Sequence, residues 1–196
     1  SDFFFQPVAN DAGTSLGAAL LAYHEKLNQK QRYPLSHLYF GPEYSPEEIE
    51  RVLKNNNLAF RRFDQIEEEV ARRIAEGKIV GWFQGRMESG PRALGNRSIL
   101  ADPTRPDMKD RLNARVKHRE GFRPFTPAVL AERSGEYFEL PRGLGSPHMM
   151  LIGNVRAGMR ERIPAVTHVD GTARVQTVGE KENPRFWRLL HAFEKI

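Results

Sequence analysis

The 196-residue sequence contains no cysteine, which excludes a disulfide framework and thiolate metal sites. No apolar run approaches the roughly 20 residues that a membrane-spanning helix needs. No His-x-x-x-His pair offers two metal ligands on one helical face. Internal repeats, low-complexity tracts and a basic-then-apolar leader are also missing. These absences predict a soluble, cytoplasmic protein.

Charge of one sign is only in modest excess, since 30 Lys and Arg stand against 25 Asp and Glu. A net charge of +5 is compatible with solubility alone, with a nucleic-acid surface or with a pocket for anions. The excess is concentrated in segment 85–124, where basic residues outnumber acidic ones two to one. We therefore look for an anion site in this segment.

The hydrophobic periodicity mixes helices and strands without regular alternation. Helices are expected over about 16–23, 45–54, 64–76, 108–116 and 183–193, and strands over 58–63, 78–84, 98–101, 126–131, 149–155, 165–169 and 172–178. This order favours a mixed α/β or α+β sheet over a doubly wound parallel fold. Residues 1–30 are interpreted as the tail of a preceding domain, 31–44 as a linker and 45–196 as the main domain.

An arginine-rich loop, GRMESGPRALGNRSIL, follows the strand predicted over 78–84. Its glycines would let backbone amides approach a ligand, and an arginine fork binds phosphate or carboxylate oxygens in pairs. The alternative is a surface loop whose arginines pair with Glu88, Asp102 and Asp107. The pattern is neither a Walker loop nor a dinucleotide fingerprint, so both interpretations stay open.

Three further features allow a functional and a structural interpretation. The segment KHREGFRPF carries Lys117, Arg119 and Arg123, which either converge on an oligophosphate or form a solvated helix end. Arg174 and Gln176 share one face of a predicted strand, which either lines a polar pocket or is the wet side of a sheet. Asp11 either caps a helix or ligates a metal together with distant partners.

Four stretches together resemble the O-carbamoyltransferase family of nodulation protein U and the antibiotic-tailoring carbamoyltransferases. They are GRMESGPRALGNRSILADP, LNARVKHREGFRPFTPAVL, SPHMML and HVDGTARVQTV. The leading FQPVANDAGTSLGAAL is similar to the end of that family's amino-terminal domain. The resemblance thus covers essentially the whole chain as a carboxy-terminal fragment.

The resemblance implies an actin-like, ATPase-type amino-terminal domain and a carboxy-terminal domain of the YrdC-like fold, a twisted mixed sheet with flanking helices. The YrdC-like domain is expected to join carbamoyl phosphate to ATP, supplied with Mg²⁺, and to form carbamoyl-adenylate with loss of diphosphate. The neighbouring domain, which holds iron, then passes the carbamoyl group to an acceptor hydroxyl. Carried over residue by residue, the family's anion and nucleotide positions are Arg92, Lys117, Arg119, Arg123, Met149 and Arg174, and Asp11 matches an iron ligand.

The roles implied by the resemblance are specific. Lys117, Arg119 and Arg123 would neutralise phosphates, Arg92 would orient carbamoyl phosphate, and Arg174 with Met149 would line the adenylate pocket. Arg86 and Arg97 are expected only to brace the loop. No side-chain nucleophile is implied.

The resemblance also implies limits and leaves rivals open. The family continues beyond the position of Ile196 into a nucleotide-binding motif, so these 196 residues alone are expected to be inactive, and Asp11 is expected to hold metal only in the full-length enzyme. Alternatives are an RNA-binding module with a basic cleft and a non-catalytic dimerisation domain, and a homodimer is compatible with the sequence. The partners expected are small-molecule substrates and the amino-terminal domain of the same polypeptide, not a membrane.

Overall fold

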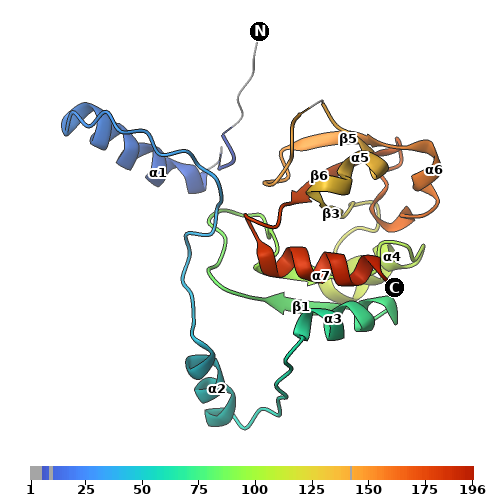
Figure 1. Cartoon of the computed structure of the whole chain (residues 1–196). Coiled ribbons are helices and arrows are strands. Elements are labelled where there is room, and N and C mark those ends of the chain that lie inside the picture. Colours follow the sequence, from blue (N-terminus) through green and yellow to red (C-terminus); the bar gives the residue numbers. More distant parts are fainter. Residues whose placement is uncertain (1–5, 9–10, 142) are drawn as a thin grey trace.

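The computed structural model describes residues 6–8, 11–141 and 143–196 of the chain (Figure 1). The elements are α1 (Asp11–Leu21), η1 (Ala22–Lys26), α2 (Pro46–Asn55), α3 (Ile66–Ala75), β1 (Val80–Phe83), β2 (Arg97–Leu100), α4 (Met108–Leu112), η2 (Asn113–Lys117), β3 (Ala128–Leu130), η3 (Ala131–Arg133), α5 (Ser134–Tyr137), β4 (Phe138–Glu139), β5 (Leu151–Val155), α6 (Ala157–Arg160), η4 (Pro164–Val166), β6 (Thr172–Val178) and α7 (Pro184–Glu194).

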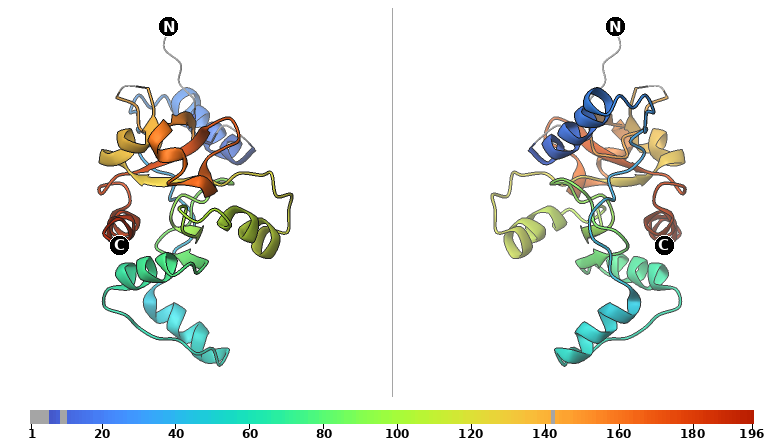
Figure 2. Two further views of the ribbon diagram at one scale, coloured as in Figure 1. Left: turned by 90° about the vertical axis from the view of Figure 1, so that its right-hand side faces the viewer. Right: turned by 90° about the vertical axis from the view of Figure 1, so that its left-hand side faces the viewer.

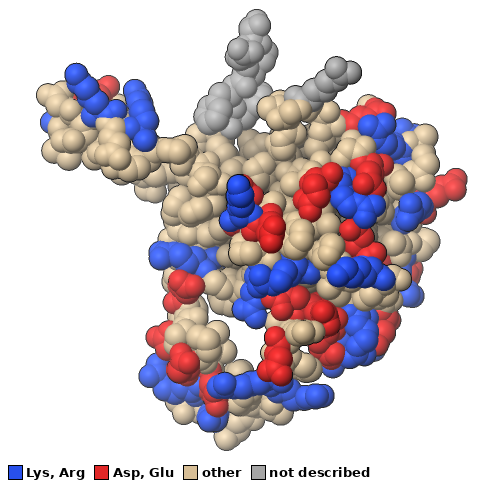
Figure 3. Space-filling model, viewed as in Figure 1, with Lys and Arg blue, Asp and Glu red and all other residues tan. Residues whose placement is uncertain are grey.

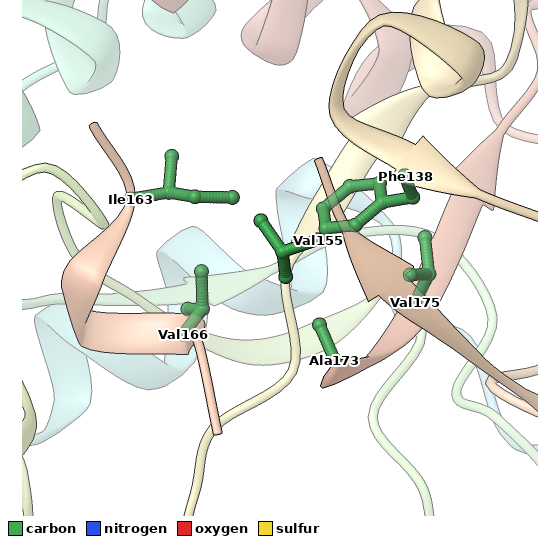
Figure 4. Packing of buried hydrophobic residues seen from close by; sticks show 6 residues of the cluster. All are labelled: Phe138, Val155, Ile163, Val166, Ala173 and Val175. Carbon is green, nitrogen blue, oxygen red and sulfur yellow. The ribbon is translucent and has the colours of Figure 1, made fainter. Parts of the chain in front are cut away.

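A four-stranded mixed sheet forms the upper layer of the body, in the order β3-β6-β5-β4. β3 runs parallel to β6, whereas β5 is antiparallel to both β6 and β4. Apolar side chains on one face of β5 and β6 pack with Phe138, Ile163 and Val166 into a core cluster (Figure 4). The expected mixed α/β fold, with a mixed sheet and flanking helices, is confirmed.

A second layer contains the antiparallel pair β1-β2 and two helices that pack on it, α3 and α7. Val70 and Ile74 of α3, Trp82 of β1 and Leu189 of α7 form its buried cluster. The helical period of the α3 residues places them on one face, as the sequence predicts. This layer fixes the strand from which the arginine-rich loop leaves.

The first two helices extend from opposite ends of the body, and the chain between them runs along its side (Figures 1 and 2). Neither α1 nor α2 has a buried residue. α2 begins with the predicted capping box, in which Ser45 and Glu48 exchange side-chain and backbone hydrogen bonds, and Pro46 holds its first position. Across the described ranges, none of the helices has the length and apolarity needed to cross a bilayer.

Two predicted strands are wrong. Residues 58–63 alternate in polarity but form no strand, and Leu58 and Phe60 stay exposed because no neighbouring strand lies beside them. Segment 165–169 is not a strand either. Its first residues belong to the 3-10 turn η4, in which Pro164 holds the first position and removes a backbone donor.

Candidate functional site

The arginine-rich loop between β1 and β2 closes around one buried carboxylate, that of Glu88. The Glu88 side chain has no exposed surface. Its Oε1 accepts hydrogen bonds from the backbone N–H groups of Leu94 at 2.5 Å, Asn96 at 2.9 Å and Arg97 at 3.3 Å. A carboxylate with several charge-assisted acceptor bonds is a strong local anchor. Glu88 therefore folds residues 88–97 into a closed loop.

Arg97 completes this closure from the start of β2. Its Nε donates to Glu88 Oε2 at 3.0 Å, and its Nη2 donates to the Gly90 carbonyl at 2.7 Å. Asn96 Nδ2 donates to the Arg86 carbonyl at 2.7 Å. The expectation that Arg97 braces the loop is confirmed, whereas Arg86 contributes its backbone and keeps an exposed side chain.

Arg92 lies on the outside of this closed loop, and its side chain is exposed. Within residues 6–8, 11–141 and 143–196, it has no carboxylate partner. Two effects lower the pKa of Arg174 on β6. The larger is burial, and the second is the positive charge of Arg92. Arg174 is half-buried, and its Nε and Nη2 donate to Thr126 Oγ1 at 3.3 and 3.0 Å. Two neighbouring cations are thus left without a neutralising side chain in the described structure, an arrangement suited to an anion.

A second basic group follows η2. Arg119 Nε donates to Asn113 Oδ1 at 2.7 Å, and its guanidinium lies 4.7 Å from the centre of the Phe125 ring. Burial and then the charge of Arg123 lower the pKa of Arg119. Arg123 is exposed and lies 3.8 Å from Glu120. Arg119 therefore also has a structural role, because it holds Asn113 and Phe125. Most N–H donors of Arg123 have no partner among the described residues.

Segment 123–126 connects the two basic groups. Arg119 stacks on Phe125, and the next residue, Thr126, accepts the hydrogen bonds of Arg174. The chain reaches this segment through His118, whose left-handed backbone ends η2 directly after the exposed Lys117. The charge of Arg92 thus acts on Arg174 and that of Arg123 on Arg119, whereas the side chain of Lys117 makes no hydrogen bond or ion pair among the described residues.

The sequence profile described as Carbamoyltransferase C-terminus matches residues 71–196, which contain both basic groups. The chain belongs to the carbamoyltransferase family. This membership confirms the resemblance seen in the arginine-rich motifs.

Curated relatives match nearly the whole chain. Nodulation protein NolO of Bradyrhizobium diazoefficiens is 47% identical over 198 residues, covering 99% of this chain and 36% of that protein. Nodulation protein U of Azorhizobium caulinodans is 39% identical, covering 100% and 33%. The 3'-hydroxymethylcephem-O-carbamoyltransferase of Amycolatopsis lactamdurans is 38% identical, covering 98% and 35%. The chain therefore spans about a third of the length of these relatives.

The two other predicted site residues are Met149 and Asp11. Met149 has a left-handed backbone with φ of 58° and packs with Val8, Leu38 and Leu94 beneath the arginine-rich loop. Asp11 is exposed at the first position of α1. The described residues contain no group of three or more side chains that could hold a metal ion.

Two hollows lie away from the predicted site cations. A cleft of about 1480 Å³ between α3 and α7 has charges of both signs, and a largely apolar hollow of about 570 Å³ lies between α7, α3 and β3. Neither is lined by Arg92, Lys117 or Arg174. The candidate site is therefore the cationic surface formed by the exposed Arg92 and the half-buried Arg174 of β6.

Sequence reasoning missed Glu88 as the organiser of the loop and treated it only as an ion-pair partner. Its position between Met87 and Ser89 carries no local signal of burial. The three backbone donors that it binds come from residues 94–97, on the far side of the loop. Only the closed loop reveals its role.

Proposed function

We propose that the full-length protein is an O-carbamoyltransferase and that this chain contains the part that activates carbamoyl phosphate with ATP as carbamoyl-adenylate. Family membership supports the reaction class. The observation that carries the location is the juxtaposition of Arg92 and Arg174 without a carboxylate partner among the described residues. A phosphate between two guanidinium groups would relieve their mutual repulsion.

The proposed roles follow the positions of the cations. Arg92, exposed on the closed loop, orients carbamoyl phosphate, and Arg174, fixed by Thr126, contacts the adenylate. Lys117, Arg119 and Arg123 neutralise the phosphates of ATP. Met149 lines the adenylate pocket. It packs against the cluster that contains Leu94 of the arginine-rich loop. Catalysis by such residues is positioning and charge stabilisation, without a side-chain nucleophile.

Atom balance defines the activation step. Water releases inorganic phosphate from carbamoyl phosphate, and an oxygen of the resulting carbamate attacks the α-phosphorus of ATP in line. The bond from that phosphorus to the bridging oxygen of diphosphate breaks, and diphosphate leaves with its charge held by the cations. The acceptor hydroxyl then attacks the carbonyl carbon of carbamoyl-adenylate, loses its proton and displaces AMP.

The proposed reaction involves Mg²⁺, and iron is expected elsewhere in the full-length protein. Mg²⁺ would arrive with ATP and neutralise its phosphates. Iron was expected in the amino-terminal domain, with Asp11 as one ligand. The other iron ligands are expected in the amino-terminal domain, outside this chain, so the role of Asp11 stays a proposal for the full-length protein and no step is assigned to the metal.

The proposal extends to domain organisation. Residues 1–30 would belong to the amino-terminal domain that receives carbamoyl-adenylate, residues 31–44 would connect the domains, and residues 45–196 would form the activating domain. The relatives are about three times as long as the chain, which is compatible with an additional domain before it.

The test supplies the full-length protein with carbamoyl phosphate and ATP and measures diphosphate. We expect carbamoyl-phosphate-dependent diphosphate, and Lys117→Ala should lower its rate by about 10²-fold, as for loss of one preorganised charge in a transition state. Arg51→Ala, which removes an exposed cation from α2, is the matched control and should leave the rate unchanged. Absence of diphosphate, or an unaffected Lys117→Ala rate, would contradict the proposal.

The RNA-binding and dimerisation alternatives are outcomes of two accompanying measurements. RNA bound along a basic groove would lose affinity steeply with salt, because backbone contacts release counterions. A dimer that occludes Arg92 and Arg174 would show concentration-dependent mass without nucleotide binding. Either result, in place of saturable ATP binding, favours the alternative.

A further inference from the structure

Residues 38–42 of the connecting segment lie against the start of the arginine-rich loop, and we call them the strap. The Gly41 amide donates to the Met87 carbonyl at 2.8 Å, and the Met87 amide donates to the Pro42 carbonyl at 3.0 Å. The Ser89 amide donates to the Leu38 carbonyl at 2.6 Å. These bonds flank Glu88, the residue that closes the loop. The strap therefore holds the loop at its anchor.

Tyr39 reaches the other end of the same loop. Its hydroxyl donates to the Leu94 carbonyl at 3.0 Å and accepts a hydrogen bond from Asn183 Nδ2 at 2.9 Å. Asn183 also caps α7, because its Oδ1 accepts from the Phe186 amide at 3.1 Å. Burial raises the pKa of Tyr39, so its hydroxyl stays a donor throughout the neutral range. One side chain thus joins the strap, the loop and α7.

Leu94 is held on both its backbone and its side chain. Gln176 Nε2 donates to the same carbonyl at 2.9 Å, and this residue lies two positions after Arg174 on β6. The Leu94 side chain is 1% exposed and packs on Leu38 of the strap. Because Leu94 is two residues from Arg92, its placement sets where Arg92 stands relative to β6.

We propose that the strap positions Arg92 against Arg174 and that Tyr39 is its positioning residue, through the Leu94 carbonyl. The inference rests on the proposed function, since Arg92 and Arg174 are its anion ligands. The strap continues the chain that comes from α1 along the side of the body (Figure 2). A displacement of the strap would move Leu94 and, through it, Arg92.

The first variant is Tyr39→Phe in the full-length protein, because it removes the hydroxyl and keeps the ring. We expect the KM for carbamoyl phosphate to rise roughly three- to tenfold, the range for loss of one neutral hydrogen bond, with a smaller change in kcat. Hydrogen exchange at amides 94–97 should become faster while exchange in α3 stays the same. A residue with a purely structural role would not shift KM selectively.

The second variant, Gly41→Ala, lifts the strap without touching Tyr39. An added Cβ would lie 2.8 Å from Met87 Cβ and 2.9 Å from its carbonyl oxygen, closer than such atoms approach. Gly17→Ala in α1 is the matched control, because its added Cβ meets nothing within 4 Å. We expect Gly41→Ala to reproduce the faster exchange and the higher KM, and Gly17→Ala to change neither.

The outcomes separate this inference from the proposed function. Unchanged exchange at amides 94–97 in both variants overturns the inference, whatever the activity. Faster exchange with an unchanged KM overturns the link to Arg92. A wild-type protein that forms no diphosphate contradicts the proposed function, while the exchange measurement still decides whether the strap holds the loop.

Discussion

Glu88 shows at the scale of one residue how a buried charge can organise a binding loop. Its carboxylate is desolvated, and three amides and the Arg97 guanidinium replace its water. Such a group specifies one loop conformation because leaving any donor unpaired is costly. The exposed arginine of the loop can then stay free for a ligand, since Arg97 and Glu88 satisfy each other.

Replacing Glu88 with Gln should destabilise the protein by about 3 kcal/mol, near the lower end for breaking a buried ion pair, because Arg97 keeps 33% of its side chain exposed. Urea unfolding measures the change. The matched control is Glu76→Gln at the C-cap of α3. The ion pair of Glu76 with Arg72 is exposed on both sides, so its loss should leave the free energy of unfolding nearly unchanged. Equal effects in the two variants would contradict the anchor role.

At the scale of the element, the loop and α7 meet at Gly95. Its φ of +105° lies in a region that other residues rarely adopt, and an added Cβ would lie 2.7 Å from Cγ of the buried Phe186. Gly95→Ala should therefore cost about 3 kcal/mol through strain and overpacking. Chemical denaturation measures this loss. The control is Gly81→Ala in β1, where an added Cβ meets nothing within 4 Å, so the free energy of unfolding should hardly change. A similar loss of stability in both variants would contradict the specific role of Gly95.

The elements that the sequence predicts well are those with local determinants. The capping box from Ser45 to Glu48 starts α2, and the Asp170-Gly171 turn with its following alternation places β6 at Thr172–Val178. Segment 58–63 has the polar and apolar alternation of a strand but pairs with no described strand. The local sequence cannot show whether a pairing strand lies beside it. The arginine-rich loop is recognisable from its own glycines and arginines, whereas the contact of Tyr39 with Leu94 joins residues 55 positions apart and has no local signal.

At the scale of the whole molecule, the net charge of +5 is unevenly distributed along the sequence. On the face shown in Figure 3, basic and acidic side chains are intermixed over α3 and α7. Arg185 and Arg188 share Glu67 there, and Arg72 pairs with Glu69. These pairs neutralise one another, so they leave little net positive field at α3 and α7 to attract an anion.

Inorganic diphosphate should therefore stabilise the protein through a local site. A ligand that binds only the folded state adds about 2.7 kcal/mol at a concentration of 100 Kd, which raises the Tm. Arg92→Ala should raise the Kd about tenfold and reduce the Tm shift, because Arg92 is an exposed cation without a carboxylate partner among the described residues and its charge acts on Arg174. Arg51→Ala removes the same charge from α2 and should keep the full shift. If both variants lose the shift equally, net charge rather than the Arg92 loop binds the anion, and a steep salt dependence would accompany that result.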